Sequence, residues 1–307
     1  MANRFLAGSF EPVAKEQTVT EPAVTGTIPE YLDGRYLRNG PNPIGEIDPV
    51  AYNWFVGDGM VHGLRLSGGR AEWYRNRWVR NRPVTAALGE PASDTSFFGG
   101  LDLATNTNVF AQAGRTFAAA EGGAVPYELT DELDNVGPCD FDGTLHGAYT
   151  GHPQRDPQTG ELHAVSYFFG WGNRVQYTVI GTDARVRRTV DIEVGGSPMM
   201  HNFSLTEKYV VIYDLPVTFD PRVAAKASTP RYLRGAARLM LSATIGRIRI
   251  PDPIVASVSR RATSNGTFPY AWDAAYPARI GVLPRDGDAG DIRWFDIDPC
   301  YVFHPLN

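Results

Sequence analysis

Histidine is the side chain of this sequence that could best support metal chemistry, because neutral imidazole is the commonest protein ligand of metal ions. Spacing alone does not locate a site, since no pair forms a short-range motif such as H-E-x-x-H. Taken one by one, each histidine is more often a satisfied structural residue than a ligand. The six histidines are His62, His146, His152, His163, His201 and His304.

Patterns for several other chemistries are missing from the sequence. There is no glycine-rich phosphate loop and no G-x-S-x-G nucleophile turn. The most basic segment, residues 221–262, lacks the aromatic interleaving of a nucleic-acid stacking platform, so a nucleic-acid partner is not expected. Cys139 and Cys300 are too few for a disulfide framework and lack metal-site spacing, so we expect buried or free thiols.

The elements that must position the histidines are predicted to be short strands. Glycine and proline, 32 and 23 of the 307 residues, exceed average usage, so long helices should be few. Runs rich in β-branched and aromatic residues are separated by turn residues, which predicts an all-β sandwich, barrel or propeller. These runs are a hairpin at 60–81, a meander at 161–171, 174–181 and 185–194, and a strand at 208–217.

One segment departs from this pattern. Residues 221–262 contain nine basic side chains and one acid, a local charge of +8 in a chain of net charge −5. Apolar residues at spacings of three and four predict a basic amphipathic helix over 231–248, ended by Pro251 and Pro253. Such a helix can lie on an anionic membrane surface. The alternative is a helix packed on the domain with a solvated basic face.

Composition indicates a folded protein, with 43% hydrophobic and 21% charged residues. No apolar run reaches the length of a membrane span, and the first residues lack the apolar core of a secretory signal. We therefore expect a soluble, cytoplasmic protein that is peripheral to the membrane if the basic helix docks there.

Five motifs, in order, carry a family resemblance. Two are YLDGRYLRNGPNP at 31–43 and WFVGDGMVHGLRL at 54–66. The other three are GAYTGHPQRDPQTGEL around His152, GGSPMMHNFSLTEKYVVIYDLPV around His201 and DIDPCYVFHPLN around His304. From about residue 29 to its last residue the sequence resembles the carotenoid cleavage oxygenases, iron enzymes that split alkene bonds of polyenes and stilbenes with dioxygen.

The resemblance implies an all-β, seven-bladed β-propeller with one Fe(II) per chain on its axis. By motif matching, His152, His201 and His304 are three of four histidine ligands, and such a set leaves positions free for dioxygen. In FAAAEGGAVPYEL, Glu121 matches the carboxylate that accepts a hydrogen bond from His201. An exposed turn glutamate is the alternative. In ATNTNVF, Thr107 matches the residue beside the open iron position.

The sequence departs from the family in two places. Family members that cleave phenolic stilbenes tend to have a lysine where Ala120 stands, so the substrate is expected to be a carotenoid or apocarotenoid. The family's fourth histidine lies near the end of a longer chain, and nothing here replaces it. His62, His146 and His163 stand in other contexts and are expected to be structural.

These expectations combine into one description. Residues 1–307 form a partial, single propeller domain of about four to five blades, with an N-terminal arm at 1–28 and a helical insertion at 221–262. The resemblance implies a non-haem Fe(II) dioxygenase that converts a lipophilic polyene and O2 into two carbonyl products, with a peripheral membrane contact through 231–248. The alternatives are a non-catalytic, C-terminally truncated propeller fragment and a stilbene-cleaving member of the same family. Isomerase activity, also found in the family, stays open.

Overall fold

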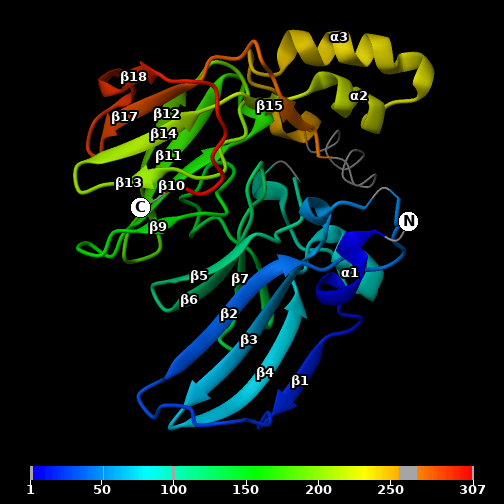
Figure 1. Cartoon of the computed structure of the whole chain (residues 1–307), viewed down its shortest axis with the longest axis vertical. Helices are drawn as coiled ribbons and strands as arrows, with labels where there is room; N and C mark the ends of the chain where they lie inside the picture. The colour runs from blue at the N-terminus through cyan, green and yellow to red at the C-terminus, as the bar shows by residue number, and fades with distance from the viewer. Residues whose placement is uncertain (1–2, 51, 99–100, 256–267, 306–307) are drawn as a thin grey trace. The chain divides into compact units, whose positions relative to one another are not determined.

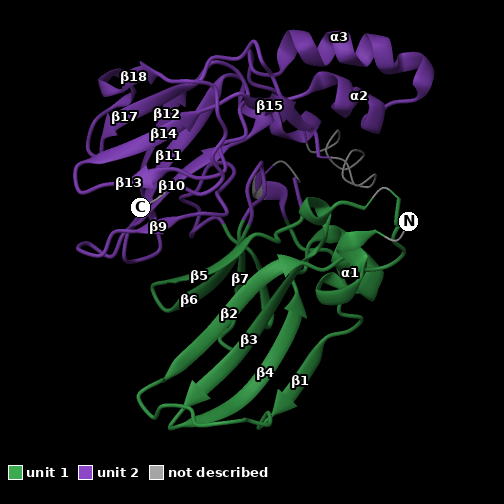
Figure 2. Cartoon of the chain, in the orientation of Figure 1, with its two compact units in different colours: residues 1–94, 104–119, 126–139 green, residues 95–103, 120–125, 140–307 purple. Residues whose placement is uncertain are grey.

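Sheet dominates the structure, a computed structural model that describes residues 3–50, 52–98, 101–255 and 268–305 (Figure 1). The chain divides into two compact units (Figure 2). Unit 1 comprises residues 1–94, 104–119 and 126–139, and unit 2 comprises residues 95–103, 120–125 and 140–307. Because the chain crosses between the units several times, each unit is built from separate stretches of sequence.

Unit 1 consists of two four-stranded antiparallel sheets and short helices. The first sheet has the order β1-β4-β3-β2, with β1 Gln17–Thr20, β2 Gly34–Pro41, β3 Gly59–Ser67 and β4 Arg70–Trp78. The second has the order β5-β6-β7-β8, with β5 Asn108–Gln112, β6 Arg115–Ala119, β7 Tyr127–Leu129 and β8 Asn135–Pro138. The helices are η1 Arg4–Leu6, η2 Gly8–Phe10, η3 Trp54–Val56 and α1 Arg82–Leu88.

The predicted hairpin at 60–81 is confirmed as β3 and β4. Gly68 and Gly69 both have positive φ at its turn, which glycine adopts without steric cost. Part of the expected N-terminal arm also belongs to this sheet, because β1 pairs along β4.

Unit 2 contains two further four-stranded sheets and one two-stranded sheet. One has the order β12-β11-β10-β9, with β9 Gln154–Arg155, β10 Leu162–Tyr167, β11 Arg174–Ile180 and β12 Val186–Glu193. The other has the order β13-β14-β17-β18, with β13 Ser204–Leu205, β14 Tyr209–Asp214, β17 Arg279–Pro284 and β18 Arg293–Asp296. β15 Val217–Phe219 pairs with β16 Tyr270–Trp272. The helices are η4 Ser96–Phe98, η5 Phe169–Trp171, α2 Pro221–Ser228, η6 Arg231–Leu233, α3 Arg234–Thr244 and η7 Ala289–Asp291.

The two larger sheets of unit 2 share one hydrophobic core. Buried side chains of β10, β11 and β12 form a single cluster with buried side chains of β14 and β17. The predicted meander supplies the first set, and β14, predicted as part of 208–217, supplies much of the second. Full burial of each such aliphatic side chain stabilises the fold by about 1.5–3 kcal/mol.

A buried carboxylate also belongs to this core. Asp214, at the end of β14, is fully buried and accepts hydrogen bonds from Tyr276 Oη at 2.6 Å, Arg279 Nε at 2.8 Å and the Gly195 backbone N–H at 3.0 Å. The Arg279 guanidinium lies 4.1 Å from the centroid of the Trp294 ring. These contacts compensate the loss of hydration that burial of a charge imposes.

The predicted basic helix is present, but it ends earlier than its periodicity indicated. α3 stops at Thr244, because Ile245 is extended and Gly246 has φ +72°, so the chain leaves the helix before Pro251. Ahead of it, α2 begins at an Asp220 cap whose side chain accepts from the N–H groups of Arg222 and Val223. Residues 256–262 of the predicted insertion lie outside the described part of the chain. Among the described residues, no helix combines the length and apolarity that crossing a membrane requires.

Candidate metal centre

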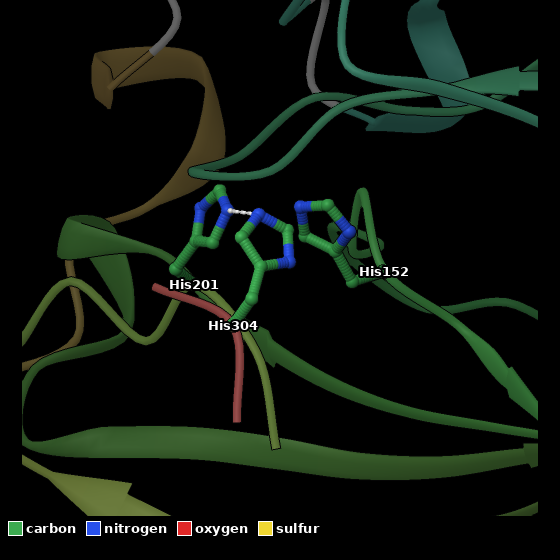
Figure 3. A group of neighbouring side chains, drawn as sticks. All are labelled: His152, His201 and His304. Atoms are coloured by element: carbon green, nitrogen blue, oxygen red, sulfur yellow. Dashed lines mark hydrogen bonds between the residues drawn. The ribbon is translucent and has the colours of Figure 1, made fainter. Parts of the chain in front are cut away.

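Three imidazoles converge in unit 2 (Figure 3). One nitrogen atom each of His152, His201 and His304 lies within 4.8 Å of the others. The Nε2 atoms of His201 and His304 are 3.3 Å apart, and the ring centroids of His152 and His201 are 4.4 Å apart. Convergence of three nitrogen donors from distant parts of the sequence is the geometry that a histidine metal site needs.

None of the three histidines lies within a regular strand. His152 precedes the edge strand β9, and its backbone N–H donates to Thr150 Oγ1 at 3.1 Å. His201 precedes the edge strand β13, and His304 follows β18. Positions outside the strand ladders let each side chain turn toward the cluster.

A carboxylate orients the central imidazole. Glu121 Oε1 lies 2.7 Å from His201 Nδ1, and the Glu121 side chain is only 16% exposed, so this residue is not an exposed turn glutamate. A carboxylate accepts, so Nδ1 of His201 carries the proton and Nε2 presents a lone pair to the cluster. Gly122 and Gly123 follow in positive φ, and a Cβ on Gly123 would lie 2.5 Å from the Phe168 ring. The turn that places Glu121 therefore requires glycine.

Burial holds one imidazole of the site, that of His152, in the form that binds metal. Burial, with His201 and His304 nearby, lowers the pKa of His152 to about 3, so its ring is neutral at ordinary pH. Its Nε2 is buried and has no hydrogen-bond partner among the described residues. Such an atom is costly unless something binds it. Imidazole nitrogens suit iron, zinc, copper or nickel, so the three residues fit a transition-metal ion.

Three tyrosines that the sequence did not single out surround Glu121. Burial, with the Glu121 carboxylate nearby, raises the pKa of Tyr167, Tyr270 and Tyr301, so their hydroxyls stay protonated. Tyr301 Oη donates to the backbone oxygen of Met199 at 3.1 Å, close in sequence to His201. No sequence signal marked them, because buried tyrosines are ordinary core residues.

Thr107 lies in unit 1, immediately before β5, and its predicted place beside a metal stays a prediction. Its backbone N–H donates to the Ala119 oxygen at 3.1 Å, and it lines a cavity of ≈ 620 Å³ within unit 1 together with Asn39, Trp54 and His62.

The remaining histidines and the cysteines lie outside the cluster. His62 is half-buried, with Nδ1 2.8 Å from Tyr74 Oη, and His146 is exposed. His163 is buried between Tyr177 and Arg285. Among the described residues neither cysteine forms a disulfide, and Cys139 is buried whereas Cys300 is exposed.

The comparisons with known proteins agree with one another. Residues 10–307 match the family model RPE65, Retinal pigment epithelial membrane protein. A carotenoid cleavage oxygenase of Mycobacterium tuberculosis is 63% identical over 307 residues, which cover 99% of this chain and 61% of that protein. A carotenoid 9,10(9',10')-cleavage dioxygenase 1 of Phaseolus vulgaris is 30% identical over 345 residues, covering 100% of this chain and 54% of that protein.

A solved structure shares the fold. The crystal structure of Pseudomonas brassicacearum lignostilbene dioxygenase matches with a TM-score of 0.69 and 24% identity, over 95% of this chain and 55% of that one. The chain thus spans about three fifths or less of the length of these relatives.

Proposed function

The chain belongs to the RPE65 family, and we propose that the whole protein is a non-haem Fe(II) dioxygenase that cleaves a conjugated C=C bond of a carotenoid or apocarotenoid. One molecule of O2 supplies both oxygen atoms of the two carbonyl products, so no external reductant is needed. The observation that carries the proposal is the convergence of His152, His201 and His304 beside Glu121. The names of the relatives in Mycobacterium tuberculosis and Phaseolus vulgaris support the reaction class.

The fold that we propose for the whole protein is a seven-bladed β-propeller, of which residues 1–307 supply part. The four four-stranded antiparallel sheets of the described residues support this, because a propeller blade is a four-stranded sheet. Residues 221–262 are then an insertion within a blade, since β14 and β17 pair on either side of it.

The chain's own residues would prepare the centre in defined ways. His152, His201 and His304 would hold the iron through ring nitrogens. Bound there, a ferrous ion supplies the binding and activation of dioxygen. Glu121 keeps the proton of His201 on Nδ1, and burial keeps His152 neutral, so both rings retain a lone pair without loss of a proton.

The residue before Glu121 supports a lipophilic substrate. Ala120 is buried and carries no charge, so this position offers no partner for a phenolate oxygen. A polyene hydrocarbon needs no such partner, whereas a phenolic stilbene would leave its oxygen unpaired in an apolar site.

Anaerobic iron loading followed by oxygen uptake tests the proposal. We expect about one Fe(II) per protein and, with a carotenoid in 18O2, label in both carbonyl products. His201→Ala should abolish iron binding, while His146→Ala, which removes an exposed histidine, should bind iron like the wild type. Absence of iron binding, or loaded protein that consumes no oxygen with any carotenoid, would refute the function.

We also propose that the segment containing α2, η6 and α3 docks a cytoplasmic protein on anionic membrane, where such substrates dissolve. α3 has no buried residue, and Tyr232, Leu239 and Met240 are 84%, 73% and 62% exposed. Among residues 222–249 all charged side chains are basic: Arg222, Lys226, Arg231, Arg234, Arg238, Arg247 and Arg249. Exposed apolar side chains flanked by arginines match a lipid surface of negative charge.

Liposome flotation tests this contact. Protein should float with vesicles that contain phosphatidylserine, less so in high salt, and hardly with neutral vesicles. Leu239→Asp with Met240→Asp should remove flotation, whereas Phe295→Asp, at an equally apolar exposed position of β18, should not. Equal flotation of the double variant and the wild type would contradict the proposed surface.

A further inference from the structure

Gln154 links the segment of one candidate ligand to that of another. It lies in β9, two residues after His152. Its Nε2 is 3.2 Å from Asn202 Oδ1 and also donates to the backbone oxygen of Phe203. Asn202 and Phe203 directly follow His201. One side-chain amide therefore joins the backbone beside His152 to the backbone beside His201.

The far end of this link is rigid. Phe203 is fully buried in the core of unit 2, and its backbone N–H donates to Asn202 Oδ1 at 2.8 Å. The oxygen of Asn202 thus accepts from Phe203 and from Gln154, which fixes the asparagine side chain. Both N–H groups of the glutamine amide are used, so its orientation is determined by two acceptors.

The near end has few other constraints. β9 is a two-residue edge strand whose ladder contains only the pairs Leu162↔Arg155 and His163↔Gln154. Farther along, the buried Asp156 accepts from Arg285, whose guanidinium also donates to His163 Nε2 at 2.9 Å. This contact lies on the side of β9 away from His152. On the side of β9 toward His152, the Gln154 side-chain amide donates directly to the segment just before β13. It therefore links the edges of the two larger sheets of unit 2.

We propose that Gln154 is a positioning residue that sets the separation of His152 and His201 and so preorganises the metal centre. The inference rests on the proposed function, because the separation of the two imidazoles matters only if they bind a metal ion together. When the imidazoles are already held at the correct separation, metal binding carries no entropic cost for ordering the segments that bear them. A residue with only a structural role would change the stability of the metal-free protein and leave its metal affinity alone.

Cobalt(II) titration of the protein separates these cases, because cobalt reports its ligand set through d–d absorption. Gln154→Leu keeps the approximate volume and removes both donors, and Gln154→Glu keeps the length and places a carboxylate against two oxygen acceptors. Gln154→Lys restores a donor. The control is Gln176→Leu, because Gln176 Nε2 also donates a hydrogen bond between neighbouring segments, to Asp191 Oδ1 at 2.8 Å between β11 and β12.

We expect Gln154→Leu and Gln154→Glu to weaken cobalt binding by about tenfold or more and to alter the d–d bands. Gln154→Lys should stay within about threefold of the wild type, and Gln176→Leu should bind cobalt like the wild type. If the leucine variant does not fold, the glutamate and lysine variants decide. Equal affinity and spectra of wild type and Gln154→Glu would overturn this inference alone. Failure of the wild type to bind cobalt would overturn the proposed function and this inference with it.

Discussion

Replacing Glu121 by glutamine changes one charge at the candidate centre and almost no volume. In the wild type the carboxylate accepts the His201 Nδ1 proton at 2.7 Å. Hydrogen bonds to charged groups contribute about 1.5–3 kcal/mol and neutral ones about 0.5–1.5 kcal/mol. The difference, about 1–1.5 kcal/mol, corresponds to roughly tenfold weaker metal binding, because about 1.4 kcal/mol changes an equilibrium constant tenfold.

Two features of the site add to this loss. Glu121 Oε2 is buried, and the Tyr167 hydroxyl donates toward the carboxylate, so a glutamine NH2 at that place would meet a donor and force this hydroxyl to turn. If the amide turned over, its NH2 would face Nδ1 and drive the imidazole proton onto Nε2, the atom that the metal needs. The expected loss is therefore about tenfold to a hundredfold.

The assay is anaerobic titration with Fe(II) against a competing chelator. Glu193→Gln removes the same charge from an exposed position of β12 and should bind iron like the wild type. An iron affinity within twofold of the wild type would refute the argument that Glu121 fixes the tautomer of His201.

Three further predictions concern the fold. Burial and Arg285 lower the pKa of His163 from 6.5 to about 4. Between these pH values the unfolded chain binds more protons, so stability should fall as pH falls, by on the order of 2 kcal/mol, and His163→Gln should flatten that dependence in urea unfolding. Asp214→Ala should lower the free energy of unfolding by about 3–5 kcal/mol, because it leaves a charged partner uncompensated; an unchanged urea midpoint would contradict this. Gly59→Ala should prevent normal folding, since its Cβ would lie 1.9 Å from the Thr105 oxygen, whereas Gly40→Ala meets nothing within 4 Å and should be soluble.

The sequence predicted the elements whose determinants are local. The β3–β4 hairpin follows from alternating residues around two adjacent glycines, and the meander of β10 to β12 follows from short turns. The pairing of β14 with β17 was not predictable, because α2 and α3 and the residues outside the description separate them in sequence. The end of α3 was misjudged because apolar periodicity continues to Ile248, while Gly246 leaves the helical region first.

The histidine cluster was predictable only through motifs. His152, His201 and His304 have no spacing that indicates a site, because their nitrogen atoms meet through tertiary packing of edge segments rather than on one element. Gln154 stood within the motif around His152, yet nothing in the sequence distinguished it from a solvated polar residue. Its role depends on a partner near His201, which only the folded structure identifies.

The contacts that position the three histidines of the candidate centre converge on the segment 199–203. Glu121 accepts a hydrogen bond from the His201 imidazole, and Gln154 donates hydrogen bonds to the two residues that follow His201. The segment that carries His304 reaches the same place, since Tyr301 Oη donates to the Met199 oxygen and the Phe303 ring packs edge-on against His201, 5.2 Å between centroids. Each of the other two histidines is therefore placed relative to His201 through its own contact. Because the contacts are separate, losing one should displace one imidazole, whereas moving 199–203 should disturb all three.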